Sequence, residues 1–151
     1  MGFLIMEKLV KANRHFGIVV SDLENSLKFY CDVLGFKIFK SMTESGEHLD
    51  KMLSLENVNV KTVKMTIGGD TLIELLEYQN PHSGPNNKKI NDLGASHLAL
   101  TVYDLEKTYK VLKNIGIRFT SPPQTSPDGN ALVTFCFDPD NTPIELVQVL
   151  N

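Results

Sequence analysis

Two histidines and two glutamates occupy matching places in two related stretches of the chain. Residues 15–28 (HFGIVVSDLENSLK) and 97–110 (HLALTVYDLEKTYK) are identical at six of fourteen positions, at a constant offset of 82 residues. Ordinary composition gives about one such match by chance. His15 and His97 open these stretches, and an Ile-Glu-Leu triplet follows later in each half, centred on Glu74 and Glu145. The chain therefore contains an internal repeat, each half of which begins near a histidine and ends near a glutamate.

These four residues have the chemistry of a metal site. Glu74 and Glu145 lie within apolar runs, where a carboxylate must reach water, be paired, or bind a metal ion. Imidazole and carboxylate ligands together suit Zn, Ni, Co, Mn or Fe(II). We therefore predict one divalent metal ion held by His15, Glu74, His97 and Glu145, with two octahedral positions left for water or substrate. For each residue taken alone, a satisfied core histidine or a solvent-exposed glutamate is the alternative.

The neighbours of these residues predict a substrate pocket. Side chains alternate across a strand, so residues two positions apart share a face. The residues that share a face with the histidines and glutamates are mostly small or apolar, as in a ligand pocket. The predicted pocket residues are Gly17, Val19, Leu76, Tyr78, Ala99, Thr101 and Val147.

Hydrophobic periodicity predicts the same elements in each half. In the first half we expect strands at 15–20, 36–40, 58–67 and 71–78, and a helix that starts near Ser21 or Asp22 and ends at Gly35. An insertion spans 41–57, within which 48–53 could form one or two helical turns. In the second half we expect strands at 96–102, 117–120, 132–137 and 144–150, with a helix from Leu105 that ends at Gly116.

Each half is therefore β-α-β-β-β, and the predicted fold class is α+β. A helix covers one face of each four-stranded sheet, and the other faces are expected to curve toward each other around a shared cleft. The predicted boundaries are an N-terminal extension (1–12), a first module (13–79), a polar linker (80–93) and a second module (94–151). A proline-rich loop, 121–130, could border the binding site or serve only as a connector.

Composition excludes several classes of protein. The net charge is −3 and no basic stripe occurs, which argues against nucleic acid as a partner. No apolar run approaches the roughly 18 residues of a membrane span. The stretch at residues 3–6 is too short for a signal-peptide core. The two cysteines, Cys31 and Cys136, are expected to be reduced thiols in a cytoplasmic protein.

The pattern as a whole resembles the vicinal oxygen chelate superfamily, also called the glyoxalase/bleomycin resistance/dioxygenase family. The resemblance covers nearly the whole chain beyond residue 12. It rests on residues 15–23 with Ser26, Phe29-Tyr30 and Leu34-Gly35-Phe36, on residues 73–75, on residues 97–100 with Asp104, and on residues 138–140 and 144–146. It implies tandem βαβββ modules that form a cupped mixed β-sheet barrel with helices outside, around a metal at His15, Glu74, His97 and Glu145. It also implies a small-molecule substrate with two adjacent oxygens and a homodimer, to which the first residues could contribute.

Within the superfamily, the ligand set is similar to those of glyoxalase I and the methylmalonyl-CoA epimerases. This implies a lyase or isomerase that abstracts a proton α to a carbonyl through a metal-bound enediolate, with Glu145 as the base and Glu74 as the second candidate. Glyoxalase I enzymes often carry an arginine for glutathione near the position of Val20, and this chain has none there. Epimerases often have glutamine where Glu74 stands.

Two further functions stay open at this point. An Fe(II) extradiol-type dioxygenase needs two histidines and one carboxylate, which His15, His97 and Glu145 could supply. A non-catalytic small-molecule binding or antibiotic resistance protein would use the cleft without chemistry.

Overall fold

The chain forms two compact units, each of which is built around one β-sheet. The computed structural model describes residues 9–69 and 72–150. The first unit comprises the residues up to Leu23 together with Tyr30–His82, and the second comprises Glu24–Phe29 and the chain from Ser83 onward. Most of the predicted N-terminal extension (residues 1–8), together with Asp70 and with Thr71 of the predicted strand 71–78, lies outside the described residues. The module boundaries at 79 and 94 stay predictions.

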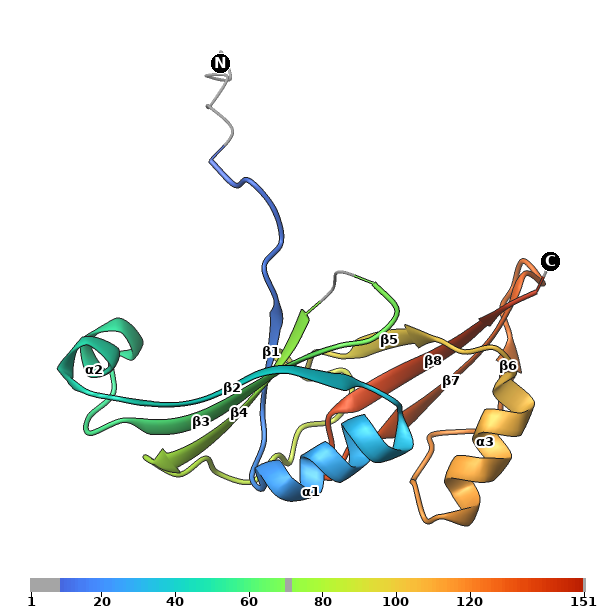
Figure 1. Cartoon of the computed structure of the whole chain (residues 1–151). Helices are drawn as coiled ribbons and strands as arrows, with labels where there is room; N and C mark the ends of the chain where they lie inside the picture. Colours follow the sequence, from blue (N-terminus) through green and yellow to red (C-terminus); the bar gives the residue numbers. More distant parts are fainter. Residues whose placement is uncertain (1–8, 70–71, 151) are drawn as a thin grey trace. The chain divides into compact units, whose positions relative to one another are not determined.

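The first sheet contains strands from the N-terminal half only. Its strands are β1 (Phe16–Val19), β2 (Lys37–Ser45), β3 (Asn59–Thr66) and β4 (Leu72–Asn80). Their order is β1-β4-β3-β2, with β1 parallel to β4 and the other neighbours antiparallel (Figure 1). The parallel pair is decisive for the site, because it sets the chain's first strand beside its fourth.

The helix after β1 is irregular. It begins as α1 (Leu23–Leu27) and continues as a π-helix, η1 (Lys28–Val33). The sequence predicts one regular helix that starts near Ser21 or Asp22 and ends at Gly35, and the π-helical turns at 28–33 correct that prediction. The wider π turns change the angle between successive residues of η1. The buried side chains of this segment are Ser26, Phe29 and Tyr30.

The segment between β2 and β3 is more ordered than the sequence predicts. β2 runs on to Ser45, and α2 (Glu47–Leu53) follows, which confirms the predicted helical turns and shortens the predicted insertion. Leu49 of α2 packs with Val58 and Val60, and Leu76 and Tyr78 join this cluster. The Asp50 carboxylate accepts hydrogen bonds from the Asn57 and Val58 backbone amides at 3.0 and 2.7 Å, which ties α2 to the start of β3.

The second sheet repeats the order of the first. Its elements are β5 (Leu98–Thr101), α3 (Leu105–Asn114), β6 (Gln124–Thr125), β7 (Ala131–Phe137) and β8 (Pro143–Val149). The strand order is β5-β8-β7-β6, with β5 parallel to β8. Asp104 caps α3, and its carboxylate accepts from the Lys107 backbone amide at 2.9 Å. The α+β class with two four-stranded mixed sheets is therefore confirmed.

One predicted strand is wrong. Residues 117–120 contribute a single bridge, between Phe119 and Cys136, and the edge strand is β6, inside the predicted proline-rich loop. Pro122 and Pro123 lack the backbone amide hydrogens that a ladder requires. Regular pairing with β7 therefore resumes only at Gln124.

In each sheet the register separates an apolar face from a mixed one. Ile18, Val20, Ile73, Leu75 and Met65 are all buried and share one face of the first sheet. Cys31 of η1 contacts Met65 on that face, Sγ to Sδ at 3.8 Å. In the second sheet the corresponding buried residues are Cys136, Ile144 and Leu146, with Leu105 and Leu112 of α3 also buried. The opposite faces carry the histidines and glutamates of the repeat.

No helix among the described residues is long and apolar enough to cross a membrane.

The turn that leads into β8 depends on Asp138. This residue is 4% exposed, and its carboxylate accepts hydrogen bonds from the backbone amides of Asp140 and Thr142 at 2.9 and 2.8 Å. Asn141 within the turn has a positive φ of 65°. The sequence prediction of a turn at 138–141 is confirmed, and the turn sets where β8, and hence Glu145, begins.

We expect Asp138→Ala to lower the free energy of unfolding by about 2 kcal/mol, because two partly buried backbone amides lose a charged acceptor. Asp138→Asn keeps a carbonyl acceptor in the same place and should lose less than half of that. Urea denaturation followed by circular dichroism measures both. Equal losses for the two variants would contradict this account of the turn.

The two thiols are free cysteines, and burial raises the pKa of both. Burial raises the pKa of Cys136, which is fully buried, to about 12. The pKa of Cys31 is also raised, chiefly by burial and then by the nearby Asp32 carboxylate. Because the thiolate is the reactive form, both thiols are poor nucleophiles near neutral pH.

We expect Cys136 in the native Cys31→Ser variant to react with a disulfide reagent at pH 8 about a thousandfold more slowly than in the unfolded chain. A pKa near 12 leaves only about one thiolate in ten thousand at that pH, against roughly a quarter for an ordinary cysteine. Absorbance of the released chromophore measures the rate. Similar rates for the native and urea-unfolded protein would contradict the burial of this thiol.

Candidate functional site

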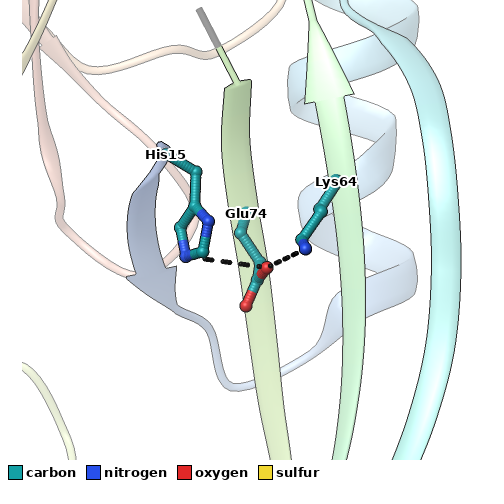
Figure 2. Close-up of polar contacts among 3 residues, drawn as sticks. All are labelled: His15, Lys64 and Glu74. Atoms are coloured by element: carbon teal, nitrogen blue, oxygen red, sulfur yellow. Dashed lines mark ion pairs between the residues drawn. The ribbon is translucent and has the colours of Figure 1, made fainter. Parts of the chain in front are cut away.

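The first His–Glu pair lies on the mixed face of the first sheet. His15 immediately precedes β1, and Glu74 lies in β4, where it is the register partner of Gly17. The His15 Nε2 atom is 3.7 Å from the Glu74 Oε2 atom, and the two side chains are 29% and 11% exposed (Figure 2). The parallel pairing of β1 with β4 therefore brings together two residues 59 positions apart in the sequence.

A lysine that the sequence reasoning did not assign to the site completes this cluster. Lys64 of β3 is the register partner of Glu74. Its Nζ atom lies 3.5 Å from Glu74 Oε2, the same oxygen that faces His15, and its side chain is 21% exposed (Figure 2). A signal was present, because Lys64 shares its predicted face with the apolar Val58 and Val60. The partner across the hairpin, however, depends on a register that the sequence does not give.

The second His–Glu pair repeats the first in the second sheet. His97 immediately precedes β5, and Glu145 of β8 is the register partner of Ala99. The His97 Nε2 atom is 3.1 Å from the Glu145 Oε2 atom, and the side chains are 47% and 25% exposed. Phe135 of β7 stands opposite Glu145 in register, and its ring packs edge-on against the His97 imidazole, with centroids 5.3 Å apart.

Imidazole nitrogen and carboxylate oxygen are donor atoms of a kind that suits a divalent ion. Metal–ligand bonds of about 2.1 Å place two ligand atoms about 3.0 Å apart at an octahedral right angle and about 3.6 Å apart at 120°. The His97–Glu145 separation of 3.1 Å is close to the right-angle value, whereas the His15–Glu74 separation of 3.7 Å exceeds both values. His15 Nδ1 is buried and has no hydrogen-bond partner among the described residues.

Each unit by itself offers two such donors. Within residues 9–69 and 72–150, no three histidine, cysteine, aspartate or glutamate side chains gather closely enough to hold a metal ion. The two pairs belong to different units, His15 and Glu74 to the first and His97 and Glu145 to the second. The four-ligand set therefore stays a prediction.

The register places the predicted pocket residues on the same faces as the glutamates. Val19 is the partner of Leu76, Tyr78 follows two residues later on β4, and Thr101 is the partner of Val147. A Cβ atom on Gly17 would stand 3.3 Å from a methyl group of Leu76. Because glycine has no Cβ atom, the Leu76 methyl group has room beside Glu74. Whether these seven residues line a substrate pocket stays a prediction.

Comparisons with known proteins identify the family of this chain. The family model described as the Glyoxalase/Bleomycin resistance protein/Dioxygenase superfamily matches residues 14–146. The chain is 31% identical over 140 residues to the uncharacterized protein YwkD of Bacillus subtilis, covering 93% of this chain and 98% of that protein. It is 30% identical over 135 residues to a probable lactoylglutathione lyase of Synechocystis, covering 89% and 92%.

More distant similarities extend to an epimerase and to a solved structure. The chain is 25% identical over 122 residues to a 2-epi-5-epi-valiolone epimerase of an Actinomyces species, covering 78% of this chain and 67% of that enzyme. A glyoxalase family protein of Bacillus cereus has the same fold, with a TM-score of 0.83 at 20% identity over 98% and 99% of the two chains. The two sheets have the same topology, and each carries a matched His–Glu pair. The family model matches most of the length of the chain. The chain therefore belongs to the glyoxalase/bleomycin resistance protein/dioxygenase superfamily.

Proposed function

We propose that the protein is a metal-dependent lyase or isomerase that removes a proton from the carbon next to a carbonyl group. One divalent ion would be held by His15, Glu74, His97 and Glu145. The observation that carries the proposal is the His–Glu pair, repeated at the same register positions of both sheets. Similarity to proteins named as a probable lactoylglutathione lyase and an epimerase supports this class of reaction.

The two glutamates are suited to different tasks. When bound, the divalent ion would polarise the substrate carbonyl and offset negative charge on its oxygen. Glu74 is nearly buried and faces both His15 and Lys64, so we assign it the role of a fixed ligand. Glu145 is more exposed, and among the described residues only His97 forms an ion pair with it. We therefore propose that Glu145 takes the substrate proton on a carboxylate oxygen.

The proposed substrate pocket is largely apolar. It would be lined by Gly17, Val19, Leu76, Tyr78, Ala99, Thr101 and Val147. Leu49 of α2 packs with Val60 on this same face, and Leu76 and Tyr78 pack against that cluster. Apolar walls around a few polar groups favour a small organic substrate.

The proposal requires the two His–Glu pairs to share one ion. The pairs would come either from one chain or from the two chains of a cytoplasmic homodimer, and in both arrangements the protein would bind one ion per chain. Independent binding by each pair would instead give two ions per chain. The metal stoichiometry therefore separates a shared site from two separate ones.

We expect the gently purified or reconstituted protein to contain about one divalent ion per chain, and His15→Ala with His97→Ala to contain less than a tenth of that. Removal of both imidazoles takes away half of the proposed ligands. Elemental analysis by mass spectrometry measures the content. The matched control is His48→Ala with His82→Ala, because both of these histidines are exposed.

Equal metal contents in the two double variants would contradict the ligand set. No metal in the wild-type protein, even after reconstitution, would favour the third function considered, a non-catalytic binding or resistance protein. Two ions per chain would contradict a shared site.

We expect Glu145→Gln to slow proton exchange between solvent and substrate at least a hundredfold, since it removes the base. Exchange at the α-carbon of a hemithioacetal or an acyl-CoA thioester in deuterium oxide is followed by NMR, at saturating metal.

Both Glu145→Gln and Glu74→Gln should weaken metal binding about tenfold or more, whereas Glu77→Gln, on the opposite face of β4, should not. Unchanged metal affinity in both site variants would show that neither carboxylate is a ligand.

A second candidate function is favoured by one observation. Lys64 already neutralises Glu74, which leaves His15, His97 and Glu145 as a two-histidine, one-carboxylate set of the kind that binds Fe(II) in oxygenases. Oxygen consumption by the Fe(II)-loaded protein with a catechol would support this alternative. Proton exchange without oxygen consumption would support the first proposal.

A further inference from the structure

The two modules differ at one position beside the proposed metal. The residue that faces the glutamate from the neighbouring antiparallel strand is Lys64 in the first sheet and Phe135 in the second. Both occupy the same register position relative to their glutamate, yet one is a cation and the other an aromatic ring. The repeat therefore keeps the His–Glu pair and changes its third neighbour.

The surroundings of Lys64 favour a cation only in part. Lys40 of β2 is the register partner of Lys64 on the same face, and two like charges directly opposite each other destabilise a sheet. The Lys64 side chain is only 21% exposed, so part of its hydration is lost as well. The ion pair with Glu74, at 3.5 Å, compensates only while that carboxylate remains free of a metal ion.

Counting the charges around the metal indicates what else Lys64 could pair with. Two glutamate carboxylates balance a divalent ion, and neutral imidazoles add no charge. With Lys64 the loaded site carries one excess positive charge, in a place where water is partly excluded. A ligand that brings one negative charge to the two open metal positions would restore neutrality.

We propose that Lys64 is a specificity-determining residue that selects a monoanionic ligand with two adjacent oxygens, of the 2-hydroxy carboxylate class. The ligand's carboxylate would accept a hydrogen bond from the Lys64 ammonium, which at present faces Glu74 Oε2 (Figure 2). This inference rests on the proposed metal-dependent function, which it narrows to acids whose carboxylate lies beside the carbon that loses the proton. Lys40 adds positive potential at the same face.

The test compares lactate with lactamide, which have the same shape but differ by one charge. Both are titrated into the Co²⁺-loaded full-length protein, and the visible spectrum of the cobalt ion reports binding without any catalytic turnover. We expect the wild-type protein to bind lactate about tenfold or more tightly than lactamide, as a charge-assisted hydrogen bond implies.

We expect Lys64→Met to bring the ratio of the two affinities close to one by weakening lactate alone, and to tighten Co²⁺ binding, since a repelling charge is removed. Lys64→Arg should restore the preference for lactate. Lys61→Met is the matched control, because it removes the same charge from the opposite face of β3 and should change nothing. Lys64→Gln provides a second neutral variant if Lys64→Met does not fold.

Two results would overturn the inference by itself. One is cobalt binding with no preference for lactate in the wild-type protein. The other is a Lys64→Met variant in which lactate and lactamide weaken by the same factor. Failure of the wild-type protein to bind cobalt would overturn the proposed function, and this inference with it.

Discussion

The parallel pairing of the first and fourth strands in each sheet is the constraint on which the candidate site depends. β1 pairs with β4, and β5 with β8, in registers that put Gly17 opposite Glu74 and Ala99 opposite Glu145. Each histidine stands two residues before the small residue of its pair, on the same face. A shift by one residue would turn the glutamate into the apolar face, where Ile73 and Ile144 now lie buried. The packing of the buried face thus holds the polar face in place.

Packing of the apolar face of each sheet determines this register. In the first sheet, fully buried Leu75 and Met65 lie on the face that η1 covers through Cys31. In the second sheet, Gln148 of β8 accepts a hydrogen bond from the Leu105 backbone amide at the start of α3, at 2.7 Å. Burial of apolar surface stabilises one register over its neighbours, so the positions of the glutamates follow from core packing rather than from any attraction to the histidines.

The two sheets share one topology but surround their glutamates with different charges. Around Glu74 are an imidazole and an ammonium group, and the carboxylate is nearly buried. Around Glu145 are an imidazole and the ring of Phe135, and the carboxylate is more exposed. Two carboxylates with different surroundings can serve as ligand and as base in one reaction, as general acid–base chemistry requires. Family membership leaves the reaction open, since the superfamily's own description spans several functions, and this asymmetry is what favours one assignment.

Local patterns were enough to predict most of this protein from its residues. The internal repeat predicted two βαβββ halves and picked out His15, Glu74, His97 and Glu145, because side-chain period and repeat offset are readable along a chain. The π-helical turn at 28–33, the edge strand at Gln124–Thr125 and the contact of Lys64 with Glu74 were not readable. Each depends on which residues meet across space: helix packing decides the π turn, prolines and pairing with β7 decide the edge strand, and hairpin register decides the neighbour of Glu74. The sequence therefore settled which residue types recur at which spacing, whereas three-dimensional packing settled which of them touch, since contact between distant residues is a property of register and not of order along the chain.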